Sequence, residues 1–534
     1  PRDATMAPNG ARPTVSLFNP AAFVPGQAGR YTHGRLAFAN VKASLPSLNV
    51  SPHPEVAEIA VSGGSLDLHG NVALASPATN CFTLTDGAAL RAGNPWTMAG
   101  DGATLLFKMD VDARATVPGF TLAGHRRVVL DGGTFSPTGA VLFTGSDAAV
   151  FTARKATVER GAEARIALSG QARFLAEEAV LRNAEKFTVK TDDDARVEVK
   201  GGALTTPLMA GAERSRIDLE GVDVAVGNWG LSNSRVRMAA CTFSPDAGFA
   251  VSGADGAYLL TNVTGATSLS GHFALAGSNV VTFTADGLGR TLVVNGGGDH
   301  GKIGSGPYGE LNLEGGTFAF RAPKASQRLN LGHGAPGNVG VLNVRGGRLV
   351  SKTTQDGATR SFGLGITHGT GFITVSGGEL DVSGLCICTE DSGNARESVF
   401  RQTGGLVKVA AGAYQPTCQS VGLCATGNGK TTRRARIALD GGVTEASVVA
   451  GGTSGRCRGG TGWTAFEANG GTVRANAADA QILRDFDEAT LGEKGLTVDG
   501  DGYDLAIAQN LAGAPGATGR LTLTGAGTKT ISGT

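Results

Sequence analysis

The chain has 534 residues, of which 83 are glycine, and its 47 basic residues nearly balance 46 acidic ones, for a net charge of +1. So small a net charge excludes a bulk field that would draw nucleic acid or an anionic membrane, and no nucleic-acid partner is expected. Every apolar run is far shorter than the roughly 18 residues that a membrane-spanning helix needs, so no membrane-spanning segment is expected.

Residues 1–55 are rich in proline and show no repeat. We expect an irregular N-terminal cap here, with a small separate domain as the alternative. Because the chain begins at Pro1 rather than Met and ends within a repeat, we expect it to be a piece of a longer protein.

From residue 56 to residue 300, one short pattern recurs: an apolar residue, any residue, and a second apolar or small residue. Seven successive copies follow a 23-residue period: Ile59/Val61, Phe82/Leu84, Leu105/Phe107, Val128/Leu130, Phe151/Ala153, Phe174/Ala176 and Val197/Val199. The alternation has the two-residue period of a strand with one buried face. A fixed period marks stacked repeats, and this one is too short to contain a strand–helix–strand unit. We therefore predict one turn of a parallel β-helix per copy, with looser copies at Ile217, Val236, Tyr258 and Val281.

The segment 172–190 contains the run Phe-Leu-Ala-Glu-Glu-Ala-Val-Leu-Arg, which favours a helix by local propensity. Phe174 and Ala176 nevertheless fall on the 23-residue repeat. Because propensity is a weak guide beside a long-range period, we predict strands here.

Residues 301–534 carry a longer form of the repeat, in which two strands flank a Gly-Gly pair. The clearest copies are 311–318, 342–349 and 373–380, and degenerate copies begin at Phe400, Ile437, Phe466, Leu496 and Leu521. Glycine suits the corners because it adopts positive φ without steric cost. The count predicts an all-β fold, a single-stranded parallel β-helix of about 19 coils. A right-handed coil is expected from the general preference of strand crossovers.

The final segment, Leu521-Thr-Leu-Thr-Gly-Ala-Gly-Thr-Lys-Thr-Ile-Ser-Gly-Thr534, resembles the passenger-associated repeat of bacterial autotransporters. The units Leu329-Asn-Leu-Gly with Leu342-Asn-Val-Arg-Gly-Gly, and Phe362-Gly-Leu-Gly with Ile373-Thr-Val-Ser-Gly-Gly, are similar to repeats of large secreted bacterial surface proteins. The resemblance covers roughly residues 311–534. It implies a secreted or cell-surface location in a bacterium and carries no specific activity.

The outward residue that follows the repeated pair is charged in six successive copies, and its sign alternates: Lys108, Asp131, Arg154, Glu177, Lys200 and Glu220. Like charges side by side in stacked strands would repel. We interpret the series as a structural charge ladder that fixes the register of the coils, with a charged binding strip as the alternative.

Three successive copies carry Glu198, Asp218 and Arg237 at the other outward position. Paired carboxylates can share the acid, base or nucleophile roles of glycoside cleavage, and arginine can hold a uronate carboxylate by two hydrogen bonds. These residues are the candidate catalytic set if the chain is a polysaccharide lyase or glycoside hydrolase. Because outward positions ordinarily hold charges, we favour a role without catalysis.

The longest steps between copies predict loops around 351–361 and 410–436, and loops commonly carry binding function. In the second loop, Asn428, Lys430, Arg433 and Arg434 offer amide and cationic donors to a glycan. The eight histidines are scattered, and no phosphate or calcium motif is complete. Neither a metal site nor a cofactor is expected.

Five of the seven cysteines are crowded into one stretch of the chain: Cys386, Cys388, Cys418, Cys424 and Cys457. Stacking Leu385 on Val421 places Cys388 beside Cys424 in the next coil, at the roughly 5 Å that a disulfide tolerates. We predict a Cys388–Cys424 disulfide and leave a second bridge open among the other three. Disulfides fit export to an oxidising compartment.

These patterns predict a structural or adhesive β-helix of a bacterial surface or secreted protein, a stalk, adhesin or matrix element that binds glycans through loops. One alternative is an enzyme that cleaves polysaccharide. The other is a filament subunit that assembles with copies of itself, since open solenoid ends can extend by strand addition.

Overall fold

The structure is a computed structural model. It describes residues 3–6, 30–31, 34–45, 48–50, 57–74, 79–211, 214–266, 272–295, 300–322, 328–353, 363–388, 397–411, 423–426, 434–451, 463–478 and 480–533.

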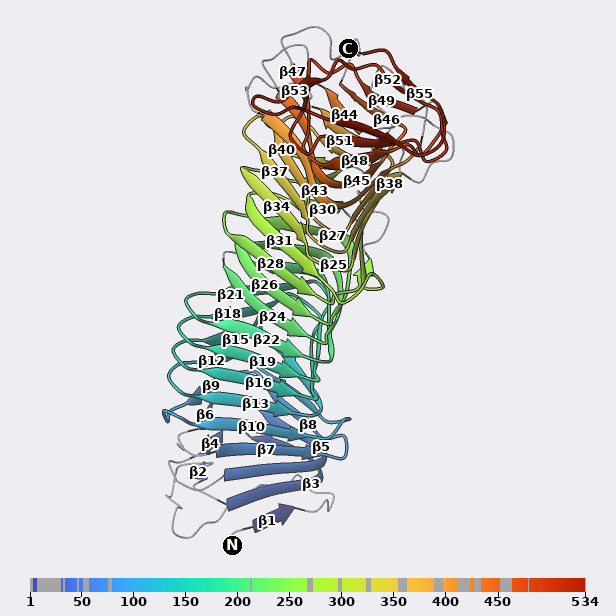
Figure 1. Ribbon diagram of the computed structural model, residues 1–534. Helices are drawn as coiled ribbons and strands as arrows, with labels where there is room; N and C mark the ends of the chain where they lie inside the picture. Colours follow the sequence, from blue (N-terminus) through green and yellow to red (C-terminus); the bar gives the residue numbers. More distant parts are fainter. Residues whose placement is uncertain are drawn as a thin grey trace. The chain divides into compact units, whose positions relative to one another are not determined.

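The chain folds into an all-β parallel solenoid of about 18 turns, and the described residues contain no helix. A typical turn has three strands, β13 (Arg127–Asp131), β14 (Thr134–Pro137) and β15 (Val141–Gly145), each paired in parallel with its counterpart in the next turn. Strands of one series therefore lie side by side and point the same way, as β13, β16, β19 and β22 do in Figure 1. The predicted fold class is confirmed.

Two compact units divide the chain: Pro1–Gly227 with Ser234–Val236, and Asn228–Asn233 with Arg237–Thr534. The predicted division at residue 300 lies inside the second unit. Within the predicted cap, β3 (Gly34–Leu45) pairs in parallel with β5 (Ala57–Leu68), so at least part of residues 1–55 is already solenoid.

The first unit builds three series of stacked strands. The first series is β1 (Asp3–Met6), β3, β5, β7 (Thr79–Thr85), β10 (Thr104–Met109), β13, β16 (Val150–Arg154), β19 (Arg173–Glu177), β22 (Arg196–Lys200) and β24 (Ser215–Glu220). The second is β8 (Ala89–Ala92), β11 (Arg114–Val117), β14, β17 (Thr157–Arg160), β20 (Val180–Asn183) and β23 (Ala203–Gly211). The third is β12 (Phe120–Leu122), β15, β18 (Ala164–Leu168) and β21 (Lys186–Thr191), preceded by a separate sheet of β2 (Arg30–Tyr31), β4 (Leu48–Val50), β6 (Val72–Leu74) and β9 (Trp96–Met98).

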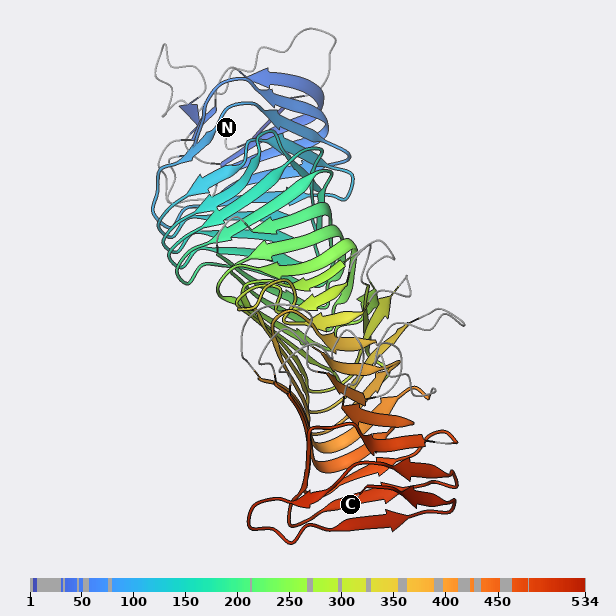
Figure 2. The same cartoon turned by 90° about the horizontal axis from the view of Figure 1, so that it is seen from above.

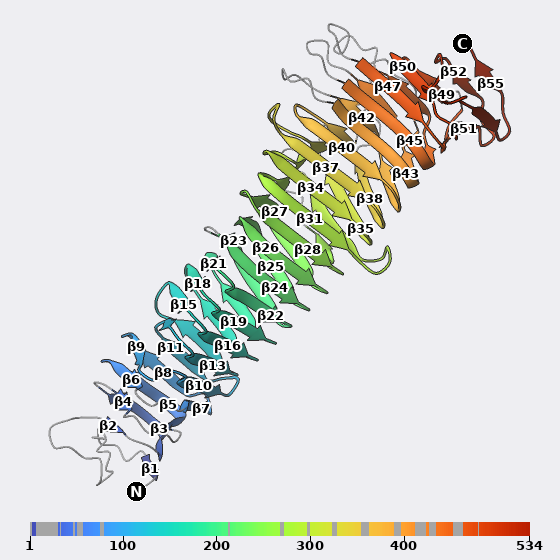
Figure 3. The ribbon, with the colours of Figure 1, turned by 60° about the vertical axis from the view of Figure 1, so that its left-hand side comes forward.

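Two strands contribute residues to both units, β25 (Asp223–Ser232) and β26 (Ser234–Ala239). The first series of the second unit continues with β28 (Gly256–Thr261), β31 (Ser278–Thr284), β34 (Tyr308–Leu313), β37 (Val339–Val344), β40 (Thr370–Val375), β43 (Glu397–Val409), β45 (Arg434–Glu445), β47 (Trp463–Ala468), β50 (Glu488–Leu491) and β53 (Ala512–Gly513). Figure 3 shows β34, β37 and β40 as parallel neighbours.

The other two series of the second unit follow the same plan, and Figure 2 shows the last turns, in red, stacked in this way. The second series is β29 (Gly265–Ala266), β32 (Thr291–Asn295), β35 (Thr317–Ala322), β38 (Arg348–Thr353), β41 (Glu379–Val382), the ends of β43 and β45, β48 (Gly471–Arg474), β51 (Leu496–Asp499) and β54 (Leu521–Thr524). The third is β27 (Thr242–Ser252), β30 (His272–Leu275), β33 (Gly301–Ile303), β36 (Leu329–Leu331), β39 (Leu364–Ile366), β42 (Leu385–Cys388), β44 (Leu423–Thr426), β46 (Val448–Gly451), β49 (Ala480–Arg484), β52 (Leu505–Ile507) and β55 (Lys529–Ile531).

The core forms because the apolar residue of each pair points inward and stacks on its counterpart. Phe151 lies opposite Phe174, with ring centroids 5.0 Å apart and ring planes within 7°. Phe120, Phe135 and Phe143 surround Phe151 with further ring contacts at centroid distances of 5.2 to 6.3 Å. The repeated apolar column of the sequence is thus a continuous aromatic and aliphatic core.

Among the seven predicted copies, from Ile59 to Val197, the observed register of the first strand series follows the 23-residue repeat with one exception. Phe82 lies opposite Phe107, two positions beyond the predicted Leu105, whereas Leu105 lies opposite Val128 as predicted. A shift of two positions keeps the same side chains inside, because the strand period is two. Phe82 thereby stacks on Phe107 with their ring centroids 5.5 Å apart.

Segment 172–190 is strand, as predicted, and forms β19, β20 and the start of β21. Two of the predicted copies near the C-terminus are second strands of a turn rather than turn starts. Leu496 pairs with Gly471 on β48, and Leu521 pairs in turn with Leu496.

The Gly-Gly corners stack directly on one another. Gly316, Gly347 and Gly378 all have positive φ, at 73°, 69° and 64°. A Cβ atom at position 347 would lie 2.5 Å from the carbonyl oxygen of Gly316 in the preceding turn. Glycine is required here both for its backbone conformation and because the corners lie too close together for a side chain.

A second file of alternating charges follows the second series of the second unit. Its members lie opposite one another in successive turns: Asp381, Lys408, Glu445, Arg474 and Asp499. Arg474 forms ion pairs with Glu445 at 3.3 Å and with Asp499 at 3.2 Å. The steps between members are unequal, so no fixed period marks this file in the sequence.

Candidate functional site

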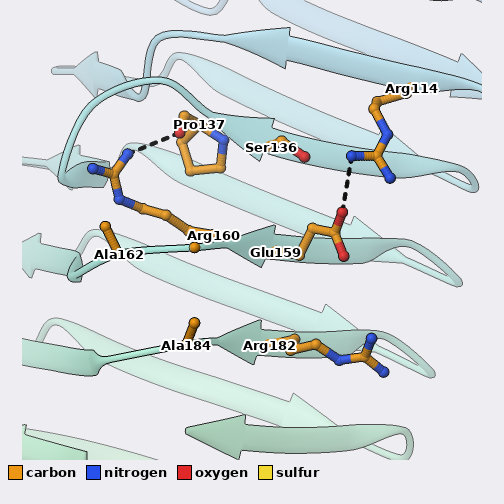
Figure 4. Close-up of a pocket in the computed structure, with 9 residues that line it drawn as sticks. Arg114, Ser136, Pro137, Glu159, Arg160, Ala162, Arg182 and Ala184 are labelled. Atoms are coloured by element: carbon orange, nitrogen blue, oxygen red, sulfur yellow. Dashed lines mark hydrogen bonds and ion pairs between the residues drawn. The ribbon is translucent and has the colours of Figure 1, made fainter.

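An open groove of about 550 Å³ lies on the second strand series of the first unit, across β11, β14, β17 and β20 (Figure 4). Its lining consists of Arg114, Ser136, Pro137, Glu159, Arg160, Gly161, Ala162, Arg182 and Ala184. The groove therefore crosses four successive turns, and each turn contributes residues to it.

The strand alternation places the polar side chains on the outside. On these four strands the inward positions hold the buried residues Ala115, Phe135, Val158 and Leu181. The neighbouring outward positions hold Arg114, Ser136, Glu159 and Arg182. The polar lining is thus attached to a backbone that the core fixes on its other side.

Two of the three guanidinium groups have partners within the groove. Arg114 Nη1 lies 3.0 Å from Glu159 Oε1. Arg160 donates hydrogen bonds to the carbonyl oxygens of Pro137, Gly139 and Glu163, at 2.9, 2.5 and 2.6 Å. Figure 4 shows Arg160 at one end of the groove and Arg114 with Glu159 toward the other. Arg160 thereby ties the turn after β17 to the turn after β14 and holds the groove wall in place.

Arg182 is different. Its side chain is exposed, it lies opposite Glu159 in the strand register, and no described residue forms an ion pair or hydrogen bond with its guanidinium group. The lining carries three guanidinium groups and one carboxylate, a formal charge of +2. The hydroxyl oxygen of Ser136 is buried and lacks a hydrogen-bond partner among the described residues. The groove can accept an anion, and Arg182 is the cation available to it.

The predicted charge ladder is a single file in the structure. Lys108, Asp131, Arg154, Glu177, Lys200 and Glu220 lie opposite one another in successive strands of the first series. Among these six residues, Arg154 and Glu177 form an ion pair, with Nε 3.0 Å from Oε2. Both side chains are about half exposed, so the pair is worth at most about 1 kcal/mol.

Exchanging the charges of Arg154 and Glu177 tests whether the file acts as a unit. In an isolated pair the double variant Arg154→Glu/Glu177→Arg would restore wild-type stability. In the ladder the moved carboxylate lies opposite Asp131 and the moved guanidinium opposite Lys200, so we expect a loss of about 1 kcal/mol in urea unfolding. An exchange that leaves the unfolding midpoint unchanged would refute the ladder, and Arg165→Glu, at an exposed site on β18, is the control.

Glu198, Asp218 and Arg237, the candidate catalytic residues, are not among the residues that line the groove. Glu198 lies directly opposite Asp218. Its carboxylate faces Arg196 at 2.7 Å, a charge contact rather than a hydrogen bond, and Arg173 at 4.0 Å. Since Arg173 and Arg196 are themselves opposite each other, Glu198 balances two stacked cations. Arg237 belongs to the second unit.

Of the predicted loop donors, Asn428, Lys430 and Arg433 lie outside the described residues. Arg434 begins β45, is exposed, and places its guanidinium carbon 5.2 Å from the centroid of the Trp463 ring. Glycan binding through this loop stays a prediction.

The residue opposite Cys424 in the observed strand register differs from the predicted one. Cys386 lies opposite Cys424, and Cys388 lies opposite Thr426. Two positions along a strand correspond to roughly 6.6 Å, at right angles to the roughly 4.8 Å between neighbouring strands. The Cα atoms of Cys388 and Cys424 are therefore roughly 8 Å apart, beyond the roughly 7 Å limit for a bridge. The side chains of Cys388 and Cys424, and all of Cys418 and Cys457, lie outside the described residues, so the disulfide pairing remains untested.

The two cysteines outside this group are both buried. Cys241 precedes β27 and is buried. Burial raises the pKa of the Cys81 thiol and so favours its protonated form.

No family model, curated protein or solved structure matches the chain. Among the described residues, no three His, Cys, Asp or Glu side chains are grouped so that they could hold a metal ion. The same residues include no helix with the length and apolar character needed to cross a bilayer.

The groove was not among the sites expected from the sequence. The signal was present in part, because Ser136, Glu159 and Arg182 follow one another at the same 23-residue interval as the ladder members. Arg114 breaks this period, since β11 pairs with β14 at a shorter step, which places Arg114 opposite Thr134.

Proposed function

We propose that the chain is a structural and adhesive element of a secreted or surface-exposed bacterial protein, and that it binds a glycan in the groove across β11, β14, β17 and β20. The observation that carries the proposal is the groove itself, with three guanidinium groups over four stacked turns. A stacked-strand backbone supplies these groups in fixed positions, so little free energy is lost in ordering the site when a ligand binds.

The lining supports binding rather than cleavage. Glycoside hydrolysis ordinarily needs two carboxyl groups facing the bond, and the lining contains one, Glu159, which is already paired with Arg114. Arg160 donates hydrogen bonds to three backbone carbonyl oxygens and so stabilises the groove wall rather than a ligand. A bound chain would therefore be gripped and oriented without a general acid beside it.

A bulky residue in the groove tests this proposal without changing any charge. Ala184 is exposed and lines the groove. Filling the space with Ala184→Trp is expected to weaken glycan binding by about tenfold, equivalent to roughly 1.4 kcal/mol. The measurement is retention on a panel of immobilised neutral and acidic polysaccharides.

The matched control is Ala257→Trp, at an exposed position on β28 in the second unit, which should bind as the wild type does. Equal retention of wild type and Ala184→Trp on every bound glycan would move the site away from the groove. No retention on any glycan would refute the adhesive part of the proposal.

A further inference from the structure

One carboxylate is already bound to a guanidinium group within the groove, that of Glu159 to Arg114. Glu159 lies between two guanidinium groups of the groove. Its carboxylate is 3.0 Å from Arg114, which belongs to a neighbouring file two turns away, and Arg182 lies directly opposite it in the next turn. On the far side of Arg182 the next residue in the register is Thr205, which is neutral. The alternation of charge therefore stops at Arg182, and the guanidinium group has no carboxylate beyond it among the described residues.

We propose that the groove takes an acidic polysaccharide of the uronate type, and that a sugar carboxylate binds Arg182 and continues the alternation. This inference rests on the proposed function and specifies its ligand. A guanidinium group matches a planar carboxylate through two parallel hydrogen bonds. Glu159 on Arg114 is an internal carboxylate–guanidinium pair of this type within the same groove.

A polymer fits the groove better than a single acidic sugar. Arg114 on β11 and Arg182 on β20 are three turns apart, which is roughly 14 Å at the usual strand spacing. One small anion cannot reach both, whereas a chain with repeated carboxylates can hold Arg182 and compete with Glu159 for Arg114. Linked contacts of this kind raise the apparent affinity through effective concentration.

Nucleic acid is a poorer match for the same cations. Proteins that bind single strands combine positive charge with aromatic side chains on which bases stack, and the groove lining has no aromatic residue. The net charge of the chain is only +1, so no wider field would add to the binding.

The experiment is titration calorimetry of the full chain with four polymers: polygalacturonate, fully methyl-esterified polygalacturonate, dextran sulfate and single-stranded DNA. We expect polygalacturonate to bind, its ester to bind at least about tenfold more weakly, and Arg182→Gln to weaken polygalacturonate by about tenfold, as for one charge-assisted hydrogen-bonded contact. Binding should also fall with added salt. Arg165→Gln removes another exposed arginine, from β18, and should bind within about twofold of wild type.

Each of the other possible outcomes would refute a specific part of the proposal. Equal binding of polygalacturonate and its ester, unchanged in Arg182→Gln but lost in Ala184→Trp, would refute the carboxylate assignment and leave the glycan groove in place. Preference for dextran sulfate or DNA would refute the uronate assignment. No binding of any polymer, with the wild-type circular dichroism spectrum retained, would contradict both the inference and the proposed function.

Discussion

Replacing Phe151 with alanine is expected to lower the free energy of unfolding by about 3–5 kcal/mol, the usual cost of removing a buried phenylalanine. Phe151 is 0% exposed, and its ring stacks on Phe174 at a centroid distance of 5.0 Å. Neighbouring turns above and below hold the surrounding strands at a fixed spacing, so the cavity can collapse only in part. Urea unfolding followed by far-ultraviolet circular dichroism measures the loss.

The control for Phe151→Ala is Phe372→Ala. Phe372 is also a phenylalanine on a stacked strand, β40, but its side chain points outward and is 38% exposed. Its removal should cost less than about 1 kcal/mol, as for most surface substitutions. Similar losses for the two variants would show that the aromatic column contributes little to stability.

Asp381→Ala is expected to cost about 2–3 kcal/mol, the next largest effect. The carboxylate side chain is 4% exposed and forms ion pairs with Arg348 and with Lys352, the latter at 2.8 Å. Removing one partner of a fully buried pair costs about 3–5 kcal/mol. Here Arg348 and Lys352 are 36% and 52% exposed, so water can take over part of their solvation and the loss is smaller.

Asp381→Asn separates charge from shape at this site, because it keeps the size of the side chain and one acceptor oxygen. We expect it to recover less than half of the loss in urea unfolding, since hydrogen bonds to a charged group are about twice as strong as neutral ones. If Asp381→Ala costs no more than the removal of Arg345, which forms an exposed ion pair with Glu314, the buried cluster adds no stability.

The sequence was sufficient for the fold because its two signals do not depend on local detail. The alternation in pairs such as Val128/Leu130 identifies strands, and the 23-residue period identifies stacking. The same periodicity ordered the charge ladder from Lys108 to Lys200 in the observed register, and the shorter step to Glu220 was also predicted correctly. The long-range period also led to the correct prediction of strands in segment 172–190, where local propensity favours a helix.

Register errors arose where the corners change length. A shift of two positions preserves the inward and outward pattern, so the sequence cannot distinguish Phe82 opposite Leu105 from Phe82 opposite Phe107. The same ambiguity led to a predicted register with Cys388, instead of Cys386, opposite Cys424. Which residues stack depends on how many residues each turn uses at a corner, and that number is set by packing.

The groove was not predicted because turn length also varies in the strand series that forms it. Its residues come from the second strand series, where the step from Arg114 on β11 to Thr134 on β14 is shorter than the 23-residue step of the first series at the same level. A fixed 23-residue period would place Arg91, Arg114, Pro137 and Arg160 in one file. The observed register instead puts Arg91 opposite Thr116 and Arg114 opposite Thr134. The local chain path, rather than the composition, brings Arg114, Glu159 and Arg182 together.

The most direct test of the groove as the ligand site is chemical protection of its arginines. The chain is modified with phenylglyoxal, which reacts with guanidinium groups, with and without saturating polygalacturonate, and each arginine is read by mass spectrometry. Arg182 and Arg114 should be protected by the polymer, and Arg165 should react equally in both samples. Unchanged modification of Arg182 while the polymer is bound would contradict the account.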